Sequence, residues 1–214
     1  MASKLGLFNG ALRELGHDKL ASLSEEAERR YVLDDVYDDV VDECLEAGQW
    51  KFAIRAVEIE DDTGIEPAFG YTYAFEKPVA DFIRLTALSD NDRLSPSLSD
   101  YREEGGYWYA DVTPLYAAYV SKDASYGLNL TEWPPGFAAF VELALAEAIC
   151  MRLTQSDSKK QAVAKNLEKA RKHARSIDAQ AGPTRNPNGA GSWINNRFSS
   201  STNTSRYDRG GGYR

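Results

Sequence analysis

The chain has 214 residues, of which 43% are hydrophobic, so it can form one folded domain, alone or with an insertion and an arm. Its formal net charge of −8 argues against general affinity for the nucleic-acid backbone, because that affinity comes from Lys and Arg that neutralise phosphates. Cys44 and Cys150 fall in apolar stretches, so buried free thiols are expected and a disulfide is not. His17 and His173 lie far apart in the sequence, so no metal site is expected.

Two helices are predicted in the first part of the chain. Apolar residues recur at helical spacing over 4–16, where Gly16 is expected to end the helix. A longer helix is predicted over 24–47, with Ser24 as its N-cap and an apolar stripe from Leu33 to Leu45. This second helix also carries a strip of acids with spacings of one, three and four residues: Asp34, Asp35, Asp38, Asp39, Asp42, Glu43 and Glu46.

From residue 53 to residue 132 the hydrophobic period changes to two, which indicates strands. Tyr71, Tyr73 and Phe75 alternate with smaller or polar residues, and "YWYAD" (107–111) and "YAAYVSK" (116–122) alternate again. Four or five short strands are expected, joined by turns at 61–64, 90–92 and 113–114.

Helical periodicity returns at residue 134, where two prolines occupy the first turn of a helix predicted over 134–155. This helix is apolar on nearly every face, but Glu142, Glu147 and Arg152 argue against a membrane span. Ser156 or Asp157 is expected to cap a fourth helix over 157–180, whose Lys and Arg face outward. The predicted fold is therefore α+β: a bundle of about four helices with a strand-rich insertion, 53–132, between the second and third helices.

The body is predicted to end at residue 182, and an extended C-terminal arm follows over 183–214. The arm holds five arginines and one acid, so it is basic whereas the body is acidic. It has too few large apolar residues for a core and is expected to be disordered in isolation. Two interpretations of the arm remain: a flexible tail with no function, and a partner-binding segment, which is favoured because aromatic residues and arginines dominate binding hot spots. The residues concerned are Arg185, Trp193, Ile194, Arg197, Phe198, Arg206, Tyr207, Arg209 and Tyr213.

No catalytic constellation is found in the sequence. It has no glycine-rich phosphate-binding loop, and neither histidine stands in a recognisable nucleophile motif, so no enzyme activity and no cofactor are expected. The acidic strip has four interpretations: a solvated helix face, a general acid–base pair, a divalent-cation site, or a wall that repels an anionic partner.

Several stretches, in this order along the chain, together resemble bacteriophage tail tubular protein A, the head-to-tail adaptor of short-tailed phages. "ALRELG" (11–16) is similar to the family's early N-x-x-L-x-x-x-G helix, and "ECLEAGQWKFA" (43–53) resembles its helix end followed by W-x-F/W-A. "FGYTYAFEKPVADFIRL" (69–85) resembles W-x-Y-A-Y-x-L-P-A-D-x-L-R-L, and "YWYADVTPLYAAYVSK" (107–122) resembles I-Y-T-D-x-P-x-x-x-R-Y-V. The segment 134–180 is similar to its final helix pair. The sequence departs from the family at Phe69 or Gly70, at Lys77 and at Ala118, where Trp, Leu and Arg are usual.

This resemblance implies a structural virion protein. Twelve copies would form a ring that docks on the portal protein, joins the head to a tail nozzle or tail-tube protein, and encloses the channel through which double-stranded DNA leaves without specific binding. The C-terminal arm would bind the portal. The protein would act at the head–tail junction of the virion after assembly in the host cytoplasm, with no role for a membrane.

In that setting the acidic strip is expected to line the channel and repel phosphates so that the duplex slides. The channel-lining residues would be Asp34, Asp35, Asp38, Asp39, Asp42 and Glu46. Two other functions remain open: a cell-wall hydrolase that uses carboxylates, and a ring-forming DNA-packaging factor. The packaging factor should carry a basic helix-turn-helix, whereas residues 1–50 are acidic.

Overall fold

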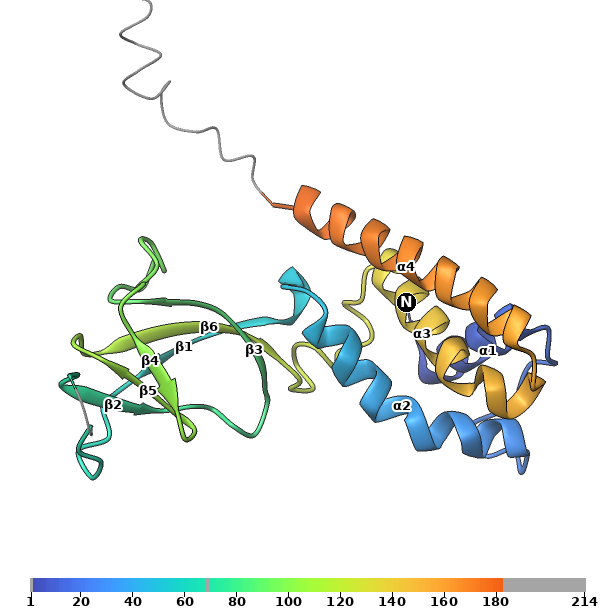
Figure 1. Ribbon diagram of the computed structural model, residues 1–214, viewed down its shortest axis with the longest axis horizontal. Coiled ribbons are helices and arrows are strands. Elements are labelled where there is room, and N and C mark those ends of the chain that lie inside the picture. Colours follow the sequence, from blue (N-terminus) through green and yellow to red (C-terminus); the bar gives the residue numbers. More distant parts are fainter. Residues whose placement is uncertain (1, 68–69, 183–214) are drawn as a thin grey trace, which may run out of the picture. The chain divides into compact units, whose positions relative to one another are not determined.

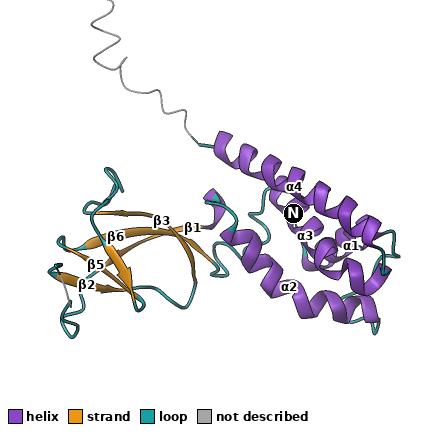
Figure 2. Ribbon diagram, viewed as in Figure 1, coloured by secondary structure: helices purple, strands orange, loops and turns teal. Residues whose placement is uncertain are grey.

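The computed structural model describes residues 2–67 and 70–182, and the predicted arm lies outside this part of the chain. The described residues form a mixed helix and strand fold, which confirms the α+β class (Figures 1 and 2). They contain four α-helices and two three-stranded antiparallel sheets. All six strands lie between the second and third α-helices along the chain.

The first two helices are α1 (Lys4–Leu15) and α2 (Glu28–Glu46). Ser3 caps α1 by accepting a hydrogen bond from the backbone N–H of Gly6, and Gly16 ends it in the left-handed conformation at φ 72°. The predicted start of α2 at Ser24 is wrong. The Ser24 hydroxyl lies 2.9 Å from the Ser22 hydroxyl, and the helix begins four residues later without a side-chain cap.

The last two helices are α3 (Pro135–Thr154) and α4 (Asp157–Gln180), joined by only two residues. Ser156 caps α4 by accepting a hydrogen bond from the backbone N–H of Lys159. The inward face of α4 is narrower than its apolar pattern predicts, because Ala162 is exposed and Ile177 is 39% exposed. Only Val163 and Ala174 of this helix are fully buried, so most of its surface is open to solvent.

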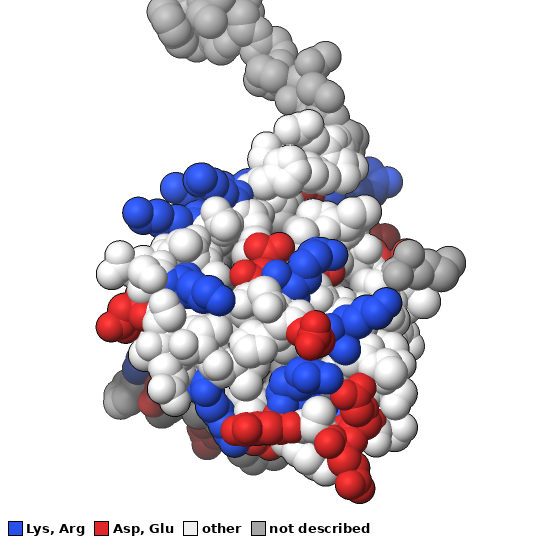
Figure 3. Space-filling model, turned by 90° about the vertical axis from the view of Figure 1, so that its right-hand side faces the viewer, with Lys and Arg blue, Asp and Glu red and all other residues white. Residues whose placement is uncertain are grey.

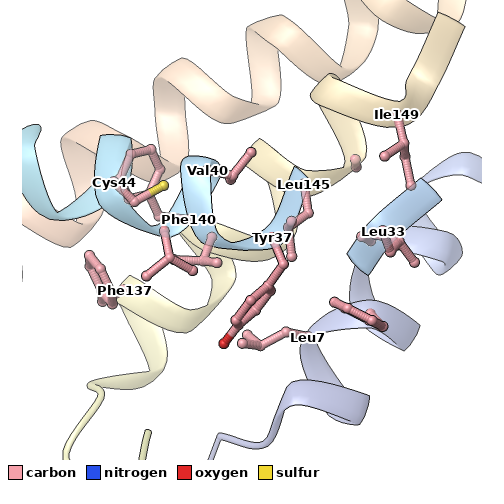
Figure 4. Close-up of a cluster of buried hydrophobic side chains, with 14 of the residues drawn as sticks. Leu7, Leu33, Tyr37, Val40, Cys44, Phe137, Phe140, Leu145 and Ile149 are labelled. Atoms are coloured by element: carbon pink, nitrogen blue, oxygen red, sulfur yellow. The ribbon is translucent and has the colours of Figure 1, made fainter. Parts of the chain in front are cut away.

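The larger core forms where α3 packs against α1, α2 and α4 (Figure 4). Its members from α2 and α3 include Leu33, Tyr37, Val40, Cys44, Phe137, Phe140, Leu145 and Ile149. Trp50, just after α2, anchors this core. Its indole N–H donates to the Cys44 carbonyl at 2.8 Å, and its ring meets Phe137 edge-on at 4.9 Å between centroids. Burial of such aromatic surfaces dominates the stability of a core.

A short 3₁₀ turn, η1 (Lys51–Ala53), leads into the first sheet, whose order is β1 (Ile54–Ile59), β6 (Leu115–Ser121), β3 (Phe82–Ser89). The second sheet has the order β2 (Tyr73–Glu76), β5 (Tyr107–Ala110), β4 (Arg102–Glu104). Six strands form, not four or five. The sequence pattern misses β3, whose register shifts twice, and β4, which is exposed throughout.

A second, smaller hydrophobic core belongs to the strands and contains Phe75, Leu88, Trp108, Ala110, Leu115 and Ala117. Val120 of β6 and Ile83 of β3 pack into the larger core, and two polar side-chain contacts add to this link between helices and strands. Arg84 of β3 donates to the Glu46 carbonyl at 3.2 Å, and Lys122 pairs with Asp42 at 2.9 Å. The end of α2 is therefore fixed against the start of the strand region.

Candidate functional site

The acidic strip lies on the surface of α2, on the side away from its buried stripe. At about 100° per residue, the six candidate channel acids from Asp34 to Glu46 fall within about 140° of the helix circumference. Most buried residues of α2, such as Leu33, Val40 and Cys44, occupy the opposite side, whereas Leu45 near the end of the helix is buried within this arc. The helix thus brings the predicted acids together on one surface, but their local environments differ.

Asp34 is the most strongly paired acid of the strip. It contacts Lys4 at 2.9 Å and Arg30 at 2.6 Å. Burial alone would raise the pKa of Asp34, but the hydrogen bonds and charges of Lys4 and Arg30 outweigh it and hold the pKa below its usual value. An ionised carboxylate held between two cations stabilises the start of α2 and is a poor general acid.

Asp35 and Asp42 are also paired, though less tightly. Asp35 lies 3.7 Å from Arg152 of α3 and is 67% exposed, while Asp42 lies 2.9 Å from Lys122. Asp38, Asp39 and Glu46, together with Glu43, are exposed and make no ion pair among the described residues; the four acids extend along the second half of α2. Uncompensated negative charge is therefore concentrated there, and no two of these carboxylates share a buried site, as acid–base catalysis would need.

A groove of about 410 Å³ lies beside this acidic surface, between α2, α3 and α4. Its apolar lining comes from Cys44, Phe140, Ala144 and Leu167, and its charged lining from Glu43, Glu46, Glu168 and Arg171. Burial raises the pKa of the Cys44 thiol to about 12, with a further contribution from the charge of Glu43. The thiol is therefore protonated near neutral pH and unreactive, so the groove offers no nucleophile.

A buried polar cluster that sequence reasoning did not single out as a site surrounds Asp81. Its carboxylate accepts hydrogen bonds from Arg55 at 2.9 Å, from Tyr119 at 3.2 Å and from Ser121 at 2.5 Å. The Asp81 carbonyl also accepts from the backbone N–H of Lys122 at 2.8 Å. Asp81 therefore joins the segment before β3 to both β1 and β6.

The electrostatics of the Asp81 cluster favour a structural role. Burial works to raise the pKa of Asp81, but the hydrogen bonds from Ser121 and Arg55 bring it below its usual value. Burial, followed by the charge of Asp81, raises the pKa of Tyr119 to about 12. A carboxylate that binds protons so weakly is a poor base for Ser121, so the cluster holds strands together and does not activate a hydroxyl. The sequence alternation indicates that Tyr119 and Ser121 lie on the same face of one strand. Only the pairing of the strands, however, brings Arg55 and Asp81 next to them.

No group of three or more His, Cys, Asp or Glu able to hold a metal ion occurs in residues 2–67 and 70–182. Within the same ranges no helix is long and apolar enough to cross a membrane. Both cysteines are buried and unpaired. The predicted arm residues, from Arg185 to Tyr213, lie outside the described residues.

Comparisons with known proteins add no family assignment. The sequence matches no protein-family model, and it matches no curated protein.

Proposed function

We propose that the protein is a head-to-tail adaptor of a bacteriophage, a structural component that forms a ring between the portal and the tail. The observation that carries this proposal is the ordered set of stretches similar to tail tubular protein A, which extends through the whole body of the chain. Two of these stretches contain the residues that fix the fold. Trp50 anchors the helical core, and Asp81 joins the strands.

The surface chemistry supports a structural role over a catalytic one. The unpaired carboxylates of α2 are exposed, the Cys44 thiol stays protonated, and the Asp81 carboxylate accepts three hydrogen bonds. None of these arrangements provides a base near its working pH beside a nucleophile.

In this proposal the basic arm of residues 183–214 binds the portal, and the strand-rich part meets the tail component. Trp193, Phe198 and the arginines of the arm supply the aromatic and charged contacts. Ordering of the arm on docking would make assembly depend on the presence of a portal. The ring lies at the head–tail junction of the virion and encloses a channel for DNA.

The experiment that tests this proposal compares the full chain with a chain that ends at residue 183. We expect both to give the same circular dichroism spectrum and melting temperature, and only the full chain to co-sediment with purified portal rings. Replacing the five arm arginines by lysine in a control chain keeps the charge and separates charge from the specific geometry of guanidinium groups. Normal portal binding by the truncated chain would remove the role assigned to the arm.

A further inference from the structure

We propose that copies of this chain associate side by side through complementary charges, with the acidic surface of α2 in one copy bound to the basic surface of α4 in the next. This inference rests on the proposed ring, and it names the faces that hold the ring together. The helix α2 carries eight acids and two arginines, whereas α4 carries seven Lys or Arg and three acids. Charge of opposite sign is therefore sorted onto two different helices.

The two charged helices flank α3, and the groove between them is lined by Glu43 and Glu46 of α2 and by Glu168 and Arg171 of α4. In Figure 1, α3 passes between α2 and α4, and it contacts both of them. Figure 3 shows the end of the molecule that lies at the right of Figure 1: Lys and Arg stand near the top, Asp and Glu near the bottom edge, and side chains of both signs are interspersed between them. A molecule with unlike charges on two different helices can bind head to tail, and such contacts close into a ring when the rotation between copies allows it.

Each surface offers charges that are not used within its own chain. Among the described residues, Asp39, Glu43 and Glu46 are exposed and make no ion pair, and neither do Lys165 and Lys169. Lys172 contacts only Glu168, at 3.9 Å, and both side chains are well exposed. Such a surface pair contributes little to stability and can be exchanged for a contact with another copy.

The unpaired acids of α2 and the exposed lysines of α4 have the same spacing along their helices. Asp39, Glu43 and Glu46 stand at positions i, i+4 and i+7 of α2, and Lys165, Lys169 and Lys172 stand at the same positions of α4. Residues with this spacing lie along one side of a helix. The two sets match residue for residue when the helices run parallel, which pairs Asp39 with Lys165, Glu43 with Lys169 and Glu46 with Lys172.

In the fold, α2 and α4 run in the same direction. The start of α2 meets the end of α3, because Asp35 contacts Arg152, and the end of α2 shares a groove with Phe140 in the first half of α3. Since α4 also returns along α3 after a two-residue turn, α2 and α4 run in the same direction. In a ring of twelve, neighbouring copies are rotated by only about 30°, so α2 and the α4 of the next copy stay nearly parallel.

The proposal removes two acids from the set that is expected to line the channel. If Asp39 and Glu46 face lysines of a neighbour, their charges are neutralised and do not repel DNA. The channel-lining prediction then depends on Asp38, which makes no ion pair among the described residues, and on Asp34, Asp35 and Asp42, which are paired within the chain.

The test uses two charge-reversed chains and no portal, so its failure is separate from failure of portal binding. One chain carries D39K, E43K and E46K, and the other carries K165E, K169E and K172E. Each should bind a copy of itself weakly, because like charges meet. An equimolar mixture should associate, because the basic α2 of the first chain meets the acidic α4 of the second. Sedimentation velocity at low salt should give a dissociation constant at least about tenfold lower for the mixture than for either chain alone.

A matched control carries E60K, E66K and D92K, which makes the same charge change at exposed positions outside the helices. Because its α2 and α4 surfaces are unchanged, this chain should associate with itself as the natural chain does. Should a reversed chain fail to fold by circular dichroism, the neutral D39N, E43Q, E46Q chain replaces it and must lose the salt-dependent self-association of the natural chain. A mixture of reversed chains that associates no better than its components, or a control chain that loses self-association as fully as the D39K, E43K, E46K chain does, overturns the proposal.

Discussion

Replacement of Asp81 by alanine should destabilise the protein strongly. The side chain is only 14% exposed and accepts hydrogen bonds from Arg55, Tyr119 and Ser121. Hydrogen bonds to a charged group are each worth about 1.5–3 kcal/mol. Arg55 is partly exposed and can be hydrated after the change, whereas the Tyr119 and Ser121 side chains are buried and would lose a partner. We therefore expect the free energy of unfolding to fall by about 3–5 kcal/mol.

The assay is urea denaturation followed by tryptophan fluorescence and by circular dichroism, at neutral pH. Asp81→Asn keeps the shape and some hydrogen bonding and should cost less than Asp81→Ala. Asp111→Ala is a matched control, because Asp111 accepts two hydrogen bonds from Thr72 at 2.9 Å but is exposed and pairs with no cation among the described residues. It should cost less than about 1 kcal/mol. An equal loss for Asp81→Ala and Asp111→Ala would refute the reasoning.

The same prediction has a pH signature. Since the pKa of Asp81 in the folded protein lies below its ordinary value of 3.8, its contribution to stability is complete above that value and is lost as the pH falls through the folded pKa. Asp81→Asn should therefore reduce the loss of stability between neutral pH and the acid range. A chain whose acid sensitivity is unchanged by Asp81→Asn would show that this carboxylate is not the one being titrated.

Three further predictions concern packing, burial and the channel. Gly127→Ala places its new Cβ 2.2 Å from the Ser121 carbonyl oxygen and should cost about 1–3 kcal/mol in urea unfolding, whereas Gly136→Ala, whose nearest neighbour is 3.4 Å away, should cost far less. Burial raises the pKa of Glu142 even though Glu142 contacts Arg13, which is well exposed. Folding therefore disfavours the ionised form of Glu142. Glu142→Gln should then raise the melting temperature near neutral pH, with a change of roughly 0.5 kcal/mol or less, and a lower melting temperature would count against this sign. In a phage that carries the gene, joint replacement of Asp35, Asp38 and Asp42 by Asn should slow DNA ejection while ring assembly stays normal, and unchanged ejection would leave these acids as a solvated helix face.

The helices were largely predictable from the sequence, because their periodicity and caps are local signals. Gly16 ends α1 and Ser156 starts α4, as their positions indicate. The start of α2 was not predictable from Ser24, because the neighbouring Ser22 hydroxyl competes for it. Such local hydrogen bonding by serine diverts it from capping.

The strand region was predictable in kind but not in pairing. Tyr73 and Trp108 lie in strands as their alternation indicates, yet nothing in the sequence says that β1 and β3 both pair with β6. The Asp81 cluster depends on that pairing, so it could not be predicted from the sequence. The acidic strip, in contrast, was visible as a helical pattern, but its division into paired and unpaired acids depends on Lys4, Arg152 and Lys122, which other elements bring close.

The central claim, that this chain is an adaptor docking on a portal, is tested most directly by native mass spectrometry of the purified chain, alone and mixed with the portal ring of its phage. The account predicts a complex in which about twelve copies of the chain bind to the portal ring, as a closed ring of twelve would give. It also predicts that the chain truncated at residue 183 binds far fewer copies. A portal ring whose mass is unchanged by an excess of the full chain would contradict the adaptor function.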